Sequence, residues 1–189
     1  MVTSTLYLVR HGETEWSRAG KHTGTTDLPL TDDGEATAAR LAPVLAELRP
    51  STVLTSPRLR ARRTAELAGF GIAEVEPDLA EWDYGDYEGL TTPEIRESVP
   101  DWSIWTHPVP GGESAGDVAE RLDRVVRRAR AADGATLVFA HGHSLRVLAA
   151  RWLDLPVAEG RHLYLDTATF SVLGDDRGQS VVVRWNVSA

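Results

Sequence analysis

Short apolar runs and helical stripes alternate along this 189-residue chain. Residues 6–9 and 135–140 form nearly continuous apolar runs, the pattern of strands that are buried on both faces. Each run leads into a histidine that precedes a glycine: His11 follows the first run and His141 follows the second. Side chains at the carboxyl ends of such strands point into the crevice where open α/β sheets bind ligands. We therefore expect both histidines at a ligand site.

Helical periodicity and turn signals predict the remaining elements. Thr31, followed by two aspartates, predicts the start of a helix whose apolar stripe runs from Ala38 to Leu48 and which Pro50 stops. The other expected elements are a strand over 52–55, a helix over 57–69, a short strand over 73–76, an irregular segment over 77–116 with a short helix near 92–98, a helix through 118–129, a helix through 145–152, and an antiparallel hairpin that joins 169–173 to 181–185.

The alternation of strands and helices predicts the fold class. It is typical of a three-layer α/β/α sandwich with a mainly parallel sheet, and the final hairpin adds an antiparallel edge. The chain has single-domain length and no internal repeat or long linker. We therefore expect residues 1–189 to form one domain.

Composition argues against several functional classes. The formal net charge of −8 argues against broad binding of nucleic acid or of anionic membranes. The absence of cysteine excludes a disulfide framework and thiolate chemistry. The amino-terminal residues do not form a charged and then apolar leader, and no apolar run approaches membrane-spanning length. We expect a cytoplasmic protein without a membrane partner, whose oligomeric state stays open.

The residues after the first apolar run carry the candidate chemistry. Arg10 offers a planar fork of donors that can grip an oxyanion. His11 can attack as a neutral imidazole near neutral pH. Gly12 permits a close approach of backbone to a ligand. Together these three residues predict a nucleophile held against an anion.

Five motifs in the same order resemble the histidine phosphatase superfamily, the phosphoglycerate mutase-like proteins. The resemblance spans nearly the whole chain and rests on Arg10-His11-Gly12, the Ser-Pro-x-x-Arg-Ala-x-x-Thr-Ala block over 56–65, the Glu-x-x-x-Gly-x-x-Glu-Gly block over 81–89, Gly112-Glu113-Ser114, and His141-Gly142. It implies a phosphoglycerate mutase-like sandwich and an enzyme that needs no metal or other cofactor. It leaves open whether Glu113 anchors its loop or touches the site.

The resemblance also implies roles for the core residues. His11 becomes the nucleophile that carries a phosphohistidine, and Arg10, Arg60 and His141 become ligands of the phosphate. Such a clamp suits phosphoryl transfer, which requires neutralised oxygens and an in-line arrangement. The motif, rather than the chemistry, selects Arg60 from its cluster of arginines.

A sugar or glycerate alkoxide is a poor leaving group, so a general acid is expected. Glu81 is our choice because of its place in the motif, and Asp83, Asp86 and Glu88 compete with it. The same carboxylate, once deprotonated, would activate the water that cleaves the phosphohistidine.

A further set of residues is expected to bind the substrate. The resemblance implies that the Ser17 side chain and the backbone of Thr23 and Gly24 contact the phosphate, although many members carry asparagine at the position of Ser17. The residues beside catalytic positions that are expected to contact the substrate are Tyr84, Gly142, His143 and Arg146.

The expected function is hydrolysis of a small phosphorylated metabolite, either a sugar phosphate or a bisphosphate. The motifs look closest to the sedoheptulose bisphosphatase branch, although this chain lacks that branch's longer segment before the final strands. The main alternative is a bisphosphoglycerate-dependent phosphoglycerate mutase. Mutases of this family carry a much longer stretch between the positions of Glu81 and Gly112, where this chain has only about 30 residues. An open pocket admits water and favours hydrolysis.

Two other hypotheses come from different functional classes. His141-x-His143 suggests a metal-binding hydrolase or binding module, but no further ligand set at short spacing accompanies the pair. A non-catalytic scaffold is the other hypothesis. The intact set of Arg10, His11, Arg60, Glu81 and His141 argues against it.

Overall fold

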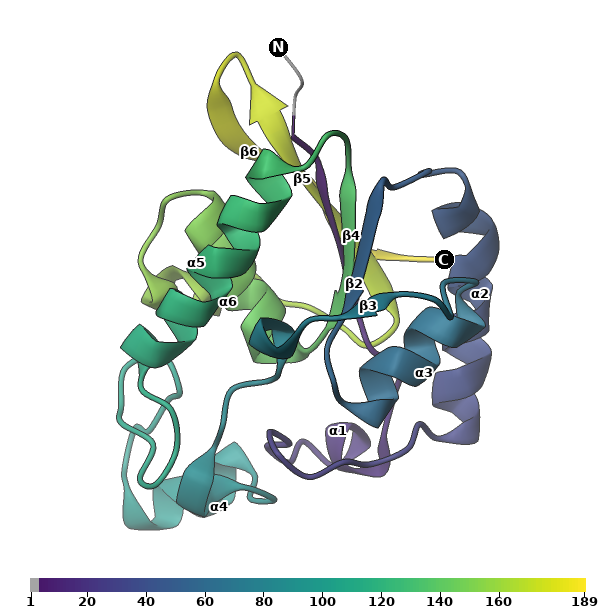
Figure 1. Ribbon diagram of the computed structural model, residues 1–189. Helices are drawn as coiled ribbons and strands as arrows, with labels where there is room; N and C mark the ends of the chain where they lie inside the picture. Colours follow the sequence, from purple (N-terminus) through teal and green to yellow (C-terminus); the bar gives the residue numbers. More distant parts are fainter. Residues whose placement is uncertain (1–3) are drawn as a thin grey trace.

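A six-stranded sheet forms the centre of the molecule (Figure 1). The computed structural model describes residues 4–189, and its strands lie in the order β3-β2-β4-β1-β5-β6. Strands β1 to β4 pair in parallel, whereas β5 pairs antiparallel with both β1 and β6. The predicted mainly parallel sheet with an antiparallel edge is confirmed. The strands are β1 (Leu6–Arg10), β2 (Thr52–Thr55), β3 (Glu74–Val75), β4 (Thr136–Ala140), β5 (Thr169–Asp176) and β6 (Gln179–Ser188).

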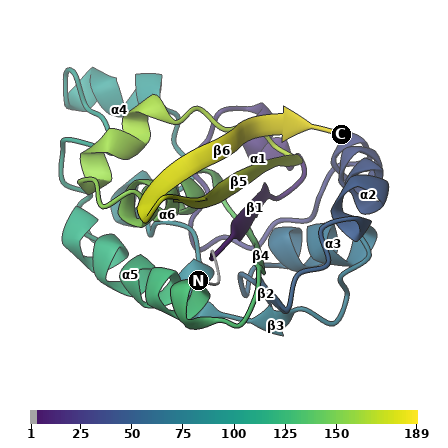
Figure 2. The ribbon, with the colours of Figure 1, turned by 90° about the horizontal axis from the view of Figure 1, so that it is seen from above.

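Helices cover both faces of the sheet (Figures 1 and 2). On one face lie α2 (Asp32–Ala46) and α3 (Leu59–Leu67), and on the other lie α5 (Ala115–Ala131) and α6 (Gly142–Trp152). The shorter helices are α1 (Glu15–Arg18), α4 (Thr92–Ser98) and the 3-10 turns η1 (Pro77–Leu79), η2 (Gly85–Tyr87) and η3 (Val157–His162). Within residues 4–189 no helix has both the length and the apolar character needed to cross a membrane.

Side chains along the central strands point alternately to the two faces of the sheet and so belong to two separate hydrophobic cores. In β1, Leu6 and Leu8 join the core beneath α5 and α6, whereas Val9 joins the core beneath α2 and α3. In β4, Val138 joins the first core and Phe139 the second. Each buried side chain of this size stabilises the fold by roughly 1.5–3 kcal/mol. Burial on both faces explains why these strands read as continuous apolar runs.

Local signals match some element boundaries and miss others. The Thr31 hydroxyl caps α2 by accepting the Gly34 N–H at 3.0 Å, as predicted. The helix ends at Ala46, before Pro50, and the chain then reverses through Arg49, whose φ is +45°. The hairpin is longer than predicted, because only Arg177 and Gly178 form its turn, both with positive φ. Neither α1 nor η3 was predicted.

The connections that leave β1 and β4 run to opposite faces of the sheet. After β1 the chain passes α1 and reaches α2, while after β4 it enters α6 directly. Neighbouring strands that diverge in this way form a topological switch point, where open α/β sheets bind ligands. The His11 N–H donates to the Ala140 carbonyl at 3.0 Å, so the two strand ends stay joined there.

The loop after β1 lies backbone to backbone against the start of α2. A Cβ built on Gly12 would stand 2.5 Å from the Gly34 carbonyl oxygen. A Cβ built on Gly34 would overlap the Glu13 carbonyl oxygen. Both positions therefore require glycine for the close approach.

Candidate active site

A cavity of about 190 Å³ opens at the carboxyl ends of β1 and β4. Three histidines, three basic side chains and one carboxylate reach its wall. The lining residues are Arg10, His11, Ser17, Gly20, Lys21, His22, Thr23, Glu81, Tyr84, Gly142, His143, Arg146, Tyr164 and Leu165.

His11 is held as a neutral imidazole with one nitrogen available. Its Nδ1 lies 2.7 Å from the Gly12 carbonyl oxygen, which can only accept, so Nδ1 carries the proton. Burial, followed by the charges of Arg60 and Arg10, holds the pKa of His11 well below its usual value. Near neutral pH the Nε2 lone pair is therefore free to attack an electrophile.

Arg10 lines the same cavity and has one unpaired donor. One terminal nitrogen donates to the Leu165 carbonyl at 2.5 Å. Its Nε is buried and has no hydrogen-bond partner within residues 4–189. A buried donor left unpaired costs about 1–3 kcal/mol, and a small movement of the guanidinium would let an oxyanion in the cavity satisfy it.

The Glu81 carboxylate is anchored at the amino terminus of α6. Its Oε1 accepts the N–H groups of Trp82 and Ser144 at 2.8 Å each, and its Oε2 accepts the His143 N–H at 3.0 Å. A carboxylate offers about four acceptor positions, so one on Oε2 remains open. Of the four competing carboxylates, Glu81 is the one that lines the cavity in the described part of the chain. Asp83 instead accepts the Gly85 N–H in a turn.

Arg60 and His141 lie together behind the cavity wall and are fully buried. The Arg60 Nε donates to His141 Nδ1 at 3.1 Å, and His141 Nε2 therefore donates to the Ser56 hydroxyl at 2.7 Å. The His11 and His141 ring centroids are 5.1 Å apart. Both side chains are thus next to the nucleophile, but direct contact with a phosphate requires these bonds to rearrange.

Hydrogen bonds with Arg60 and Glu88 hold the loop that carries Thr23 and Gly24. Arg60 donates to the carbonyls of Thr23 and Thr26 at 2.8 and 3.0 Å, and Glu88 accepts the N–H groups of Gly24 and Thr26 at 2.8 and 2.9 Å. Gly24 does not line the cavity, and its N–H is committed to Glu88. The phosphate contact at Gly24 stays a prediction, while Thr23 does reach the cavity wall.

Ser17 lines the cavity but its hydroxyl serves the capping box of α1. It accepts the Thr14 N–H at 2.9 Å and donates to the Thr14 carbonyl at 3.0 Å. Ser17 is thus near the expected substrate, but its hydroxyl is already hydrogen-bonded to the backbone of Thr14.

Tyr84, His143 and Arg146 all reach the cavity, as does Gly142. The Tyr84 hydroxyl lies 2.6 Å from His143 Nδ1, and burial raises the pKa of Tyr84 well above its usual value. Arg146 donates to the Gly160 carbonyl at 2.9 Å and lies over the Trp105 ring at 4.6 Å. Arg146 therefore also holds η3 in place.

Five lining residues were absent from the sequence prediction: Gly20, Lys21, His22, Tyr164 and Leu165. They lie in irregular segments, where periodicity carries no signal. Of these residues, His22 is the one that the sequence could have indicated, because it directly precedes Thr23, a predicted site residue. Its ring packs 4.7 Å from Tyr84, centroid to centroid.

Stability should fall on acidification because of His22. Burial lowers its pKa to about 4, whereas the unfolded chain titrates near 6.5. Between these values the unfolded state binds more protons, so the free energy of unfolding decreases as pH falls from 6.5 to 4. His22→Phe should reduce that slope by about 1 kcal/mol per pH unit. Urea unfolding of both proteins across this range measures it, and identical slopes would contradict the assignment.

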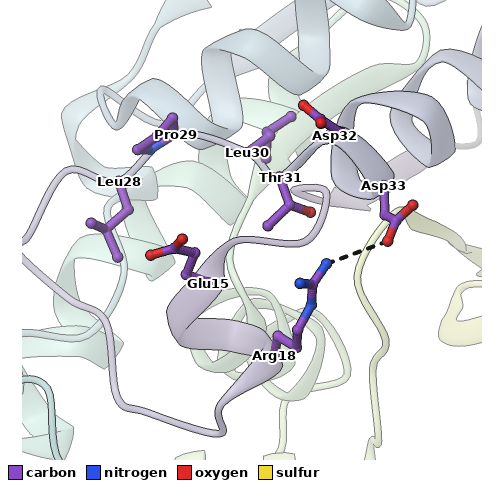
Figure 3. Close-up of a pocket in the computed structure, with 8 residues that line it drawn as sticks. All are labelled: Glu15, Arg18, Leu28, Pro29, Leu30, Thr31, Asp32 and Asp33. Atoms are coloured by element: carbon purple, nitrogen blue, oxygen red, sulfur yellow. Dashed lines mark hydrogen bonds and ion pairs between the residues drawn. The ribbon is translucent and has the colours of Figure 1, made fainter.

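A second hollow, of about 500 Å³, lies between α1 and the segment that leads into α2 (Figure 3). Glu15 and Arg18 of α1 line it together with the segment 28–33. It shares no lining residue with the histidine cavity. Arg18 is paired with Glu13 at 2.6 Å and with Asp33 at 3.3 Å, so its charge is already neutralised. The lining of this hollow includes no histidine, so it lacks the imidazole nucleophile of the first cavity.

The metal hypothesis meets a geometric obstacle at His141. Both of its ring nitrogens are engaged, one by Arg60 and the other by Ser56. Within residues 4–189 no three side chains of histidine, cysteine, aspartate or glutamate gather as a metal site. The His141-x-His143 pair therefore does not form a ligand set in this structure.

Comparisons with known proteins point to one family. The model described as the histidine phosphatase superfamily (branch 1) matches residues 6–188. The chain is 47% identical over 177 residues to an acid phosphatase of Mycobacterium tuberculosis, an alignment that covers 92% of this chain and 87% of that protein. It is 38% identical over 191 residues to sedoheptulose 1,7-bisphosphatase of Saccharomyces cerevisiae, covering 82% of this chain and 70% of that one. A solved structure of an open reading frame from Mycobacterium tuberculosis superposes with a TM-score of 0.94, at 44% identity and with 97% of each chain covered.

Proposed function

The chain belongs to the histidine phosphatase superfamily and is a hydrolase of phosphate monoesters, and on that premise we propose that it cleaves a small sugar phosphate or bisphosphate through a phosphohistidine on His11. The observation that carries the proposal is that neutral His11, the unpaired donor of Arg10 and the Glu81 carboxyl line one cavity. The cavity is smaller than the usual range of about 300–1,000 Å³ for ligand pockets, which favours a small substrate. The yeast relative, whose name specifies a sugar bisphosphate, supports the same class.

In the first step the His11 Nε2 attacks phosphorus, and the bond between phosphorus and the ester oxygen breaks. Arg10 neutralises charge on the phosphoryl oxygens, which is the main requirement of this reaction. Glu81, protonated on the open position of Oε2, gives its proton to the departing alkoxide. The products are the free alcohol, a phosphohistidine and the Glu81 carboxylate.

In the second step a water molecule attacks the phosphohistidine. The Glu81 carboxylate accepts a proton from that water as the bond between Nε2 and phosphorus breaks. Inorganic phosphate leaves, and both His11 and Glu81 return to their starting states. The expected partner is the small substrate alone, without nucleic acid or membrane, and the cytoplasmic location expected from the sequence stays a prediction.

The fate of the phosphate separates a phosphatase from a mutase. A mutase must exclude water while its intermediate reorients. Here Tyr164 at the cavity wall stays 68% exposed, and the connection between Glu81 and Gly112 is short. These features support hydrolysis over transfer.

Product analysis tests this proposal. The protein is incubated with 3-phosphoglycerate, with and without 2,3-bisphosphoglycerate, and with a panel of sugar phosphates, and products are followed by ³¹P NMR. We expect inorganic phosphate from at least one sugar phosphate and little 2-phosphoglycerate. Efficient isomerisation that depends on bisphosphoglycerate and releases no phosphate would replace the proposal with the mutase alternative.

Activity should survive removal of divalent metals, because the proposed clamp consists of arginine and imidazole. Phosphate release is measured before and after incubation with excess chelator, and the rate should not change. Vanadate, which mimics a five-coordinate phosphoryl group, should inhibit. Loss of activity that added Zn²⁺ or Mg²⁺ restores would favour the metal hypothesis.

A further inference from the structure

Arg121 is a buried arginine of α5 that the proposed reaction does not use. Its side chain stands apart from the cavity wall, and the residue is 8% exposed. It forms a two-point ion pair with Glu113, with Nε to Oε1 at 2.7 Å and a terminal nitrogen to Oε2 at 2.9 Å. A buried guanidinium needs hydrogen-bond acceptors for its remaining N–H groups, and those acceptors show which part of the chain Arg121 holds in place.

Those remaining partners are backbone carbonyls around Glu81. Arg121 donates to the carbonyls of Asp78 and Ala80 at 2.7 and 2.8 Å, and to the carbonyl of Glu81 itself at 3.3 Å. All three nitrogens of the guanidinium are thereby engaged. One side chain from α5 thus fastens the segment that leads into Glu81.

Glu113 fastens the segment that leaves Glu81. Its Oε2 accepts the Asp83 N–H at 2.9 Å, and its own N–H donates to the Asp83 carbonyl at 3.1 Å. Its carbonyl also accepts the indole N–H of Trp82 at 2.9 Å. Glu113 directly precedes Ser114, the residue that caps α5, so its place is set by the start of the helix that carries Arg121.

We propose that Arg121 and Glu113 are positioning residues, which hold the backbone on both sides of Glu81 so that its carboxyl meets the leaving-group oxygen. The carboxylate itself is held by N–H groups of α6, so the backbone anchor on α5 completes the restraint. The inference rests on the proposed role of Glu81 as general acid. Small displacements of a catalytic group can cost about 10²-fold in rate, which makes such an anchor consequential.

Arg121→Lys tests the proposal, because lysine keeps the charge but lacks the planar fork of donors. The kcat is measured for a sugar phosphate and for p-nitrophenyl phosphate, whose leaving group needs little protonation. We expect a loss of roughly 10- to 100-fold on the sugar phosphate and a clearly smaller loss on p-nitrophenyl phosphate. A merely structural role would lower both rates alike, and that result, or no change on either substrate, would overturn the proposal.

Arg124→Lys is the matched control. Arg124 lies on the same helix and makes a two-point ion pair with the Asp78 side chain at 2.8 Å, but it contacts no carbonyl beside Glu81. It should leave the ratio of the two rates unchanged. If Arg121→Lys fails to fold, Glu113→Gln, which keeps the side-chain shape, should shift the ratio in the same direction, and an unchanged ratio would again overturn the proposal.

A double variant separates this inference from the proposed function. In a Glu81→Gln background, Arg121→Lys should cost nothing further on the sugar phosphate, because the two changes remove one function. If Glu81→Gln alone shows no preference between leaving groups, the proposed acid role fails. If Glu81→Gln shows the preference and Arg121→Lys does not, only the positioning role fails.

Discussion

Replacing His11 with alanine is expected to lower kcat by a factor on the order of 10⁶, the scale seen when a catalytic nucleophile is removed. His11 is a buried, neutral imidazole at the cavity wall, its Nε2 is free, and it directly follows Arg10 in the chain. His141 cannot substitute, because both of its nitrogens are engaged. The measurement is steady-state phosphate release by the purified variant.

A trapping experiment identifies the intermediate directly. Rapid quench with ³²P-labelled substrate should yield a phosphoprotein that is labile in acid and stable in base, and His11→Ala should abolish it. His162→Ala, a change at an exposed histidine of η3, serves as the control and should retain both activity and label. Robust turnover by His11→Ala would rule out the proposed nucleophile.

Glu81→Gln is expected to lower the rate on sugar phosphates by roughly 10²- to 10⁴-fold, the usual span for general acid catalysis. Glutamine fills the same volume, and its carbonyl oxygen can accept the N–H groups of Trp82 and Ser144. Its amide nitrogen cannot accept the His143 N–H or deliver the proton. The defect should shrink on p-nitrophenyl phosphate, because nitrophenolate departs without protonation. The measured quantity is kcat on both substrates.

Asp86→Asn is the control for Glu81, since Asp86 belongs to the same motif and does not line the cavity. It should leave the ratio of the two rates near that of the unmodified protein. An equal loss on both substrates for Glu81→Gln would place its main contribution in cleavage of the phosphohistidine and not in protonation of the leaving group.

The two strand ends were predictable because their signal is local. An apolar run that leads into histidine and glycine is visible in one window, and the carboxyl ends of such strands are where open α/β sheets bind ligands. The structure places His11 and His141 together as expected, with ring centroids 5.1 Å apart. Pairing of the hairpin was predictable for the same reason, although its exact turn depended on the conformations of Arg177 and Gly178.

The wall of the cavity was less predictable because distant residues shape it. Four acidic residues between positions 81 and 88 look alike in sequence, and only the path of the chain brings Glu81 to the cavity. That path depends on Arg121, which lies 40 residues away. Gly24 shows the same limit. Its N–H is taken by Glu88, a pairing over 64 residues that no local pattern reveals.

The close contact between Gly12 and Gly34 reverses the usual preference for alanine in a helix. Gly34 lies inside α2, where alanine would normally add about 1 kcal/mol of helix stability. At this position a methyl group would collide with the Glu13 carbonyl oxygen and push the loop that carries His11 away from the helix. A thermostabilisation campaign guided by helix propensity alone would choose this exchange early and lose activity with it. Glycine at position 34 thus lowers the intrinsic stability of α2, and in return the start of the helix packs directly against the loop that carries His11 and keeps that loop in place.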